Sequence, residues 1–142
     1  MKVVIPAAGI SSRLRPSSHV THKALMNLAG KPIIGHIIDE LQKSIQIDEV
    51  IFILGPFGEQ VMDYMSKNYE HIKKSYVYQK ERKGQAHALL LTEHLIDGPF
   101  LMIFCDTVFK GKIGFNKNLC GSLGVAETDT PERFGIVELN KE

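Results

Sequence analysis

The chain has 142 residues, of which 44% are hydrophobic, and this is enough to build the core of one globular domain. Its 17 basic and 16 acidic residues nearly balance, so the overall charge gives no reason to expect nucleic-acid or membrane binding. The two cysteines cannot form a disulfide framework, and no apolar run approaches the roughly 18 residues of a membrane span. We therefore expect a soluble, cytoplasmic protein.

Strands and helices alternate along the first half of the chain. Short apolar runs rich in β-branched residues predict buried strands at Val3–Ile5 and Val50–Leu54. A loop is expected over residues 6–31, and Pro32 fits the first position of a helix. The apolar face of that helix recurs at helical spacing and comprises Ile33, Ile34, Ile37, Ile38 and Leu41. A second helix is predicted from Gly58 to about Lys67.

The same alternation continues in the second half. A strand is predicted at Tyr76–Tyr78, a helix at about Gln85–Leu95 and a strand at Phe100–Cys105, with further strand candidates at Ser122–Ala126 and Ile136–Leu139. Strands that are apolar on both faces and alternate with helices predict an α/β fold, a three-layer Rossmann-like sandwich around a mostly parallel sheet. Nothing in the composition divides residues 1–142 into separate domains.

Three candidate ligand-binding segments each follow a predicted strand. They are the loop after Val3–Ile5, the segment Gln79–Gly84, and Asp106. Ligands of parallel α/β sheets bind at the carboxyl ends of the strands, so we expect the three segments to lie along one edge.

The loop after the first strand is suited to phosphate. It contains the small residues Ala8, Gly9, Ser11 and Ser12, followed by Arg13. Small residues allow close backbone approach to a ligand, and arginine offers a forked donor for phosphate oxygens. The loop lacks both the G-x-G-x-x-G fingerprint and the P-loop pattern, which disfavours a Rossmann oxidoreductase and a P-loop kinase. Taken alone, it is equally compatible with a solvated surface turn.

Over about two dozen residues the loop resembles the signature of the sugar-1-phosphate nucleotidyltransferases, G-x-G-x-R-L-x-P-L-T-x-x-x-P-K-x-L followed by G-K-P. The matching residues are Gly9, Arg13, Leu14, Pro16, Lys23, Leu25 and Gly30-Lys31-Pro32. The resemblance is to the N-terminal portion of glucose-1-phosphate thymidylyl- and uridylyltransferases, and it implies their nucleotide-diphospho-sugar transferase fold. The departures are Ser11 for a second glycine, Ser17-Ser18 for Leu-Thr, and His22 for the proline before the lysine.

Three later segments extend the resemblance. Residues 79–88 look like the family's Q-x-x-x-x-G-x-A-x-A segment, which implies that Gln79 and Gly84 read a pyrimidine base. Asp106 stands where family members carry an aspartate that binds Mg²⁺, and Cys105 stands where glycine is frequent. Residues 129–138 resemble D-P-x-R-[YF]-G-V-V-E, which implies that Gly135 contacts the sugar.

The resemblance implies a Mg²⁺-dependent enzyme that transfers a nucleoside monophosphate from a triphosphate, preferably a pyrimidine one, to a sugar-1-phosphate or a phosphocholine-like acceptor. Pyrophosphate is released. Arg13, Lys23 and Asp106 would be catalytic, and Ala8, Gly9, Ser11 and Ser12 would hold the triphosphate. A non-catalytic nucleotide-binding or regulatory relative remains an alternative, favoured by His22 and Cys105. A homo-oligomer also remains open.

Family members carry further segments beyond the part matched here, including an E-K-P motif and a second metal-binding aspartate. We therefore expect a domain truncated at its C-terminus. Such a chain should bind nucleotide and release no pyrophosphate by itself.

Overall fold

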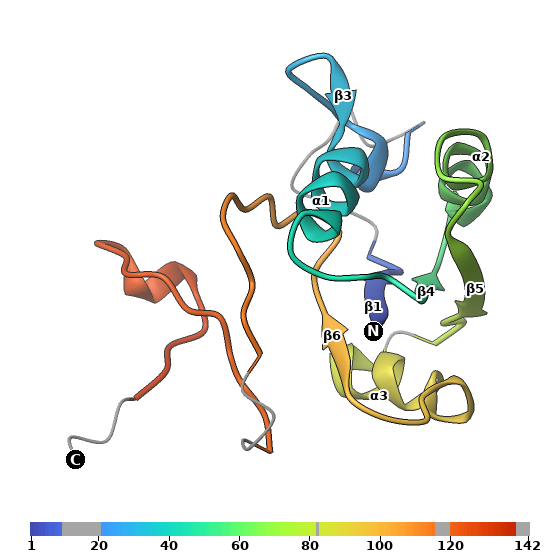
Figure 1. Ribbon diagram of the computed structural model, residues 1–142. Coiled ribbons are helices and arrows are strands. Elements are labelled where there is room, and N and C mark those ends of the chain that lie inside the picture. Colours follow the sequence, from blue (N-terminus) through green and yellow to red (C-terminus); the bar gives the residue numbers. More distant parts are fainter. Residues whose placement is uncertain (10–20, 82, 116–119, 139–142) are drawn as a thin grey trace.

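The computed structural model describes residues 1–9, 21–81, 83–115 and 120–138. Its centre is a four-stranded parallel sheet with the strand order β5-β4-β1-β6 (Figure 1). The strands are β1 (Lys2–Ala7), β4 (Glu49–Leu54), β5 (Lys73–Tyr78) and β6 (Phe100–Met102). Every residue of β4 is buried, as expected for a central strand covered on both faces.

Helices cover both faces of the sheet. On one face, α1 (Ile33–Gln42) and α2 (Gly58–Asn68) pack against alternate strand residues such as Val3, Ile5 and Phe52. On the other face, α3 (Gly84–Leu90) packs against the intervening residues, including Val4 and Ile51. Figure 1 shows the three layers, with α1 and α2 on one side of the strands and α3 on the other. The predicted three-layer α/β sandwich is confirmed.

The predicted loop over residues 6–31 contains regular structure in its described part. A 3₁₀ turn, η3 (Lys23–Leu25), is followed by the hairpin of β2 (Asn27–Leu28) and β3 (Lys31–Pro32). Ala29 and Gly30 form its two-residue turn with φ of 49° and 86°, and both angles suit a type I′ hairpin. The sequence pattern missed this hairpin because its two-residue strands are too short to show periodicity.

Two predicted elements are shorter in the structure. The helix expected to run to Leu95 ends at Leu90, and a separate 3₁₀ turn, η4 (Glu93–Leu95), follows. The hydroxyl of Thr92 donates to the carbonyl of Leu89 at 2.7 Å, which competes with helical hydrogen bonding at this point. β6 ends at Met102 instead of Cys105, and a turn closed by Thr107 N–H to Phe104 O follows at 3.2 Å.

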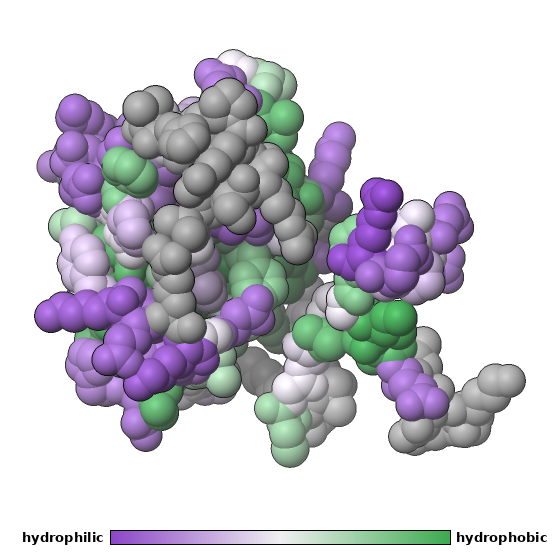
Figure 2. Space-filling view, turned by 180° about the vertical axis from the view of Figure 1, so that it is seen from behind, coloured by the Kyte–Doolittle hydropathy of each residue, from purple (hydrophilic) through white to green (hydrophobic). Residues whose placement is uncertain are grey.

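The strands predicted at Ser122–Ala126 and Ile136–Leu139 are absent from the described residues 120–138. This stretch contains one 3₁₀ turn, η5 (Pro131–Arg133), and runs away from the sheet in Figure 1. Leu123 and Ile136 are 73% and 72% exposed, and Figure 2 shows apolar surface on this stretch, apart from the body. A strand requires a neighbour for its backbone groups, and this stretch lies beside none.

Candidate nucleotide site

The carboxyl edge of the sheet brings together residues from three separate segments. β1 leads into Ala8 and Gly9, β6 leads towards Asp106, and η3 carries Lys23. Ala8 is buried, whereas Gly9 is exposed. A Cβ at Gly9 would lie 3.9 Å from Nζ of Lys23, so the small residue at this position keeps the space beside the ammonium open.

Lys23 and Asp106 form an ion pair at this edge. Nζ of Lys23 donates to Oδ2 of Asp106 at 2.7 Å, although the two residues are 83 positions apart in the sequence. The Lys23 side chain is 18% exposed and that of Asp106 is 47% exposed. The pair therefore combines a largely enclosed cation with a carboxylate that is open to solvent, and a ligand can reach it.

The surroundings of Lys23 keep it charged. Burial by itself lowers the pKa of Lys23, but the hydrogen bond that Lys23 donates to Asp106 and the charges of its neighbours outweigh burial and raise that pKa. Burial raises the pKa of the neighbouring Cys105 thiol to about 11, so the thiol is neutral at physiological pH. Cys105 itself is fully buried.

A second group of residues lies beyond β5. The amide Nε2 of Gln79 donates to the carbonyl of Gly84 at 3.0 Å and lies 3.2 Å from Nδ1 of His87. Gly84 has a φ of +88°, a conformation that residues with a side chain rarely adopt. The backbone N–H of Gln79 donates to Leu54 at the end of β4, which anchors the segment to the sheet. The structure thus brings Gln79 and Gly84 together, as their spacing predicts.

The two groups are separated by the width of the sheet. β5 and β6 are its outer strands, with β4 and β1 between them. Three strand spacings amount to about 14 Å. The two groups therefore lie towards opposite outer strands of this edge.

Comparison with known proteins identifies the family of the chain. Residues 2–142 match the model of the nucleotidyl transferase family. The chain belongs to that family.

Several known proteins are similar to the chain. The bifunctional protein GlmU of Methanococcus maripaludis is 32% identical over 139 residues, which are 98% of this chain and 33% of that protein. The UTP–glucose-1-phosphate uridylyltransferase AglF of Haloferax volcanii is 32% identical over 114 residues, covering 80% of this chain and 46% of that protein. The structure of a UDP-glucose pyrophosphorylase complexed with UDP-glucose is 28% identical with a TM-score of 0.64, covering 74% of this chain and 45% of that one.

The nucleotidyl transferase chain therefore spans about a third to just under half of the length of these relatives. The family match also confirms the expected resemblance to sugar-1-phosphate nucleotidyltransferases. None of the helices among the described residues is both long and apolar enough to span a bilayer.

The described residues do not show the remaining predicted site residues at this edge. Ser11, Ser12 and Arg13 lie outside the described residues. Gly135 is exposed and lies in the stretch that runs away from the sheet, and a Cβ there would meet nothing within 4 Å. Their roles stay predictions.

Two residues at this edge of the nucleotidyl transferase were missed by pattern reasoning. Gly55 follows β4, and a Cβ there would approach the carbonyl oxygen of Ala8 to 2.6 Å, so glycine allows the two loops to pack closely. His22 is buried directly before Lys23. The Gly55-Pro56 pair is an ordinary strand terminator, and His22 stood out only as a departure from the family signature before Lys23.

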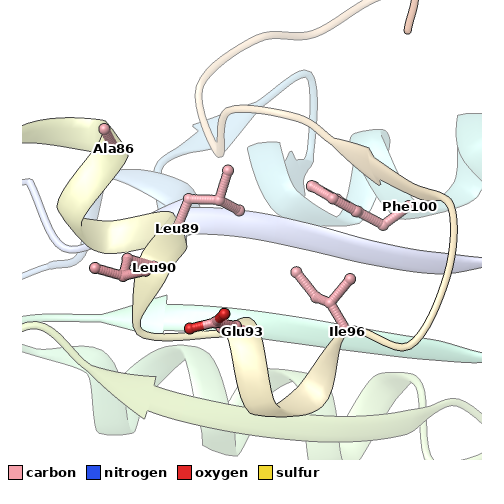
Figure 3. A pocket seen from close by; sticks show the side chains of 6 residues that line it. All are labelled: Ala86, Leu89, Leu90, Glu93, Ile96 and Phe100. Atoms are coloured by element: carbon pink, nitrogen blue, oxygen red, sulfur yellow. The ribbon is translucent and has the colours of Figure 1, made fainter. Parts of the chain in front are cut away.

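An apolar cavity lies elsewhere on the molecule. It has a volume of about 380 Å³ and is lined by Ala86, Leu89, Leu90, Glu93, Ile96 and Phe100. Figure 3 shows these side chains, which come from α3, from η4 and the residue after it, and from the start of β6, on the face that α3 covers. Its lining is almost entirely apolar and contains no cation that could bind phosphate, so we do not assign the nucleotide to it.

Asp106 is the candidate metal ligand of this edge. The described residues contain no group of three or more His, Cys, Asp or Glu side chains arranged to hold a metal ion. Mg²⁺, however, is often held by one or two carboxylates, with water and substrate phosphate oxygens completing the shell. Asp106, which is 47% exposed beside Lys23, fits that mode.

Proposed function

We propose that the chain is the nucleotide-binding part of a Mg²⁺-dependent enzyme that transfers a nucleoside monophosphate from a pyrimidine triphosphate to a sugar-1-phosphate, with release of pyrophosphate. The observation that carries the proposal is the Lys23–Asp106 pair at the carboxyl edge of a parallel sheet, beside Gly9, in a nucleotidyl transferase. The name of AglF, a UTP–glucose-1-phosphate uridylyltransferase, supports the substrate class.

The reaction is an in-line displacement. An oxygen of the acceptor phosphate attacks the α-phosphorus, the bond from that phosphorus to the bridging oxygen breaks, and pyrophosphate leaves with the electron pair. No covalent enzyme intermediate is needed. The protein contributes mainly positioning and stabilisation of negative charge.

Lys23 and Arg13 act on the charge of the departing pyrophosphate, while Ala8, Gly9, Ser11 and Ser12 hold the triphosphate. The raised pKa of Lys23 keeps its ammonium available for this role at neutral pH. Asp106 would hold Mg²⁺, and the bound ion would neutralise phosphate charge as the bond breaks. Gly135 would contact the acceptor sugar, with its surroundings supplied by other parts of the enzyme.

Gln79 and Gly84 would recognise the base. A uracil or thymine presents an imide N–H flanked by two carbonyls. Because Nε2 of Gln79 already donates to Gly84, its Oε1 is the atom that would accept from the imide N–H. A purine lacks this pattern at the same position, which gives the site its preference.

A thermal-shift panel tests the proposal. UTP, dTTP, CTP, ATP, GTP and NAD are each added with and without Mg²⁺, since a ligand that binds the native state raises apparent stability. We expect the largest shift from a pyrimidine triphosphate with Mg²⁺. Equal shifts for all nucleotides, or the largest shift from NAD, would contradict the proposal.

A further inference from the structure

His22 is held by hydrogen bonds to three different segments. Its Nδ1 accepts from the backbone N–H of Ala24 at 3.2 Å, and its Nε2 lies 2.7 Å from the carbonyl of Ala7. Its own backbone N–H donates to Oε1 of Gln60 at 2.8 Å. Because Nδ1 accepts, Nε2 carries the proton and donates to Ala7, so the ring is neutral and its tautomer is fixed.

These contacts join the end of β1, the turn η3 and helix α2. Ala7 is the last residue of β1, Ala24 lies within η3, and Gln60 belongs to α2. His22 is the N-cap of η3 and is 3% exposed. Lys23, the next residue, begins the turn, so the direction in which its side chain leaves depends directly on this cap.

The backbone of His22 has the φ that a proline ring would impose. Its φ is −61° and its ψ is 137°. Proline could hold φ at this value but has neither an N–H for Gln60 nor a side-chain link to Ala7. The chain therefore reaches a rigid geometry at this position through hydrogen bonds.

The other histidines that form hydrogen bonds in the described part of the chain do not share this arrangement. His36 contacts the carbonyl of Leu28, His71 contacts Gln42 and His87 contacts Gln79, and none of the three is buried. His22 is buried, its ring uses both nitrogens, and its neighbour in the sequence forms the ion pair of the candidate site.

We propose that His22 is a positioning residue whose imidazole fixes Lys23 against Asp106. The effect of this positioning on substrate binding rests on the proposed function, in which Lys23 contacts the triphosphate. The structural part, the link from His22 to the Lys23–Asp106 pair, can be tested without any nucleotide.

The test is trace acetylation of the 142-residue chain, with the labelling rate of each lysine read by peptide mass spectrometry. The reagent has to reach Nζ, and the pair with Asp106 leaves only 18% of the Lys23 side chain exposed. Loss of the imidazole in His22→Ala should release Lys23 from the pair and raise its labelling rate severalfold. Asp106→Asn breaks the pair directly and sets the upper reference rate.

Two further variants make the result specific. His22→Asn can still accept from Ala24 as an N-cap but cannot reach Ala7, so its Lys23 rate should lie between wild type and Asp106→Asn. This variant decides the question if His22→Ala does not fold. His94→Ala changes an exposed histidine in η4 and should leave the Lys23 rate unchanged.

A lower melting temperature with an unchanged Lys23 rate in folded His22→Ala or His22→Asn would show a packing role alone and overturn the proposal. The proposed function is tested separately by Lys23→Met, which should reduce the stabilisation by Mg²⁺–UTP. If Lys23→Met has no such effect, the phosphate role of Lys23 fails while the labelling result for His22 still stands.

Discussion

The two edges of the sheet use the same kinds of charged groups in different ways. At the amino edge, Glu49 is 3% exposed and is bound by Lys73 at 3.3 Å and by the hydroxyl of Ser75, with Lys2 at 4.0 Å. At the carboxyl edge, Asp106 has one lysine partner among the described residues and remains 47% exposed.

The difference separates a structural network from an available site. The oxygens of Glu49 are occupied by groups of its own sheet, which compensates the cost of burying the charge. Asp106 is exposed enough that its charge does not require such compensation, and it stays accessible to ligand. The comparison predicts that substitutions at the amino edge lower the free energy of unfolding. Substitutions at the carboxyl edge should instead lower the affinity for nucleotide.

Glu49→Gln should give the largest effect. Neutralising this buried carboxylate weakens its bonds to Lys73 and Ser75, and charged hydrogen bonds of this type contribute about 2 kcal/mol. Urea unfolding should show that loss, while nucleotide affinity stays near wild type. Glu70→Gln, at an exposed position, is the control and should be neutral. A Glu49→Gln variant with normal stability and poor nucleotide binding would reverse the assignment of the two edges.

Asp106→Asn should give the opposite pattern. We expect the affinity for Mg²⁺–UTP to fall about tenfold, or ~1.4 kcal/mol, with little change in unfolding free energy because exposed ion pairs contribute little. Titration calorimetry with and without Mg²⁺ measures the metal-dependent part. The matched control is Asp97→Asn, an exposed aspartate paired with Lys2 at the amino edge. An unchanged affinity of Asp106→Asn for Mg²⁺–UTP would show that Asp106 does not bind the metal and serves only in the turn.

As the pH falls, the carboxyl edge should lose its contribution to stability before the amino edge does. Burial, the largest influence, lowers the pKa of His22, so the unfolded chain binds a proton at a higher pH than the folded one. The stability from neutral His22 is therefore complete above about pH 6.5 and is lost as the pH falls from there towards the folded pKa.

Glu49 should respond at lower pH. Burial acts to raise its pKa, but the bonds from Ser75 and Lys73 outweigh burial and lower it. Its stabilisation is present above about pH 4.3 and is lost as the pH falls through the folded pKa. The free energy of unfolding in urea should be measured from pH 8 to pH 3. Its decrease near the pKa of histidine should disappear in His22→Asn, and its decrease at lower pH should shrink in Glu49→Gln. A single phase unaffected by either variant would contradict this order.

Glycine replacement should give the smallest effect. Gly84, at the carboxyl edge, has a φ of +88°, whereas Gly98, before β6, has no such conformation, and a Cβ would meet nothing within 4 Å at either position. Gly84→Ala should therefore cost about 1 kcal/mol of stability, while Gly98→Ala should be nearly neutral. Thermal unfolding of the two variants measures the difference, and equal melting temperatures would show that the backbone at Gly84 relaxes without strain.

The sequence by itself determined the central strands, the two helices on one face, and the edge at which Lys23, Gln79 and Asp106 gather. Val50–Leu54 and the helical spacing from Ile33 to Leu41 are strong local patterns that burial then reinforces. The order of elements along the chain was enough to predict a parallel sheet and its ligand edge, because connections between parallel strands are restricted.

The tertiary structure decided what depends on partners distant in sequence. Apolar content predicted strands at 122–126 and 136–139, but no neighbouring strand lies beside the described part of these segments. Likewise, the polar start of β5 becomes a strand through pairing with β4, with Lys73 opposite Glu49. The proposed role of His22 could not be predicted from the sequence either. It depends on hydrogen bonds to Ala7 and Gln60, which only folding brings within hydrogen-bond distance.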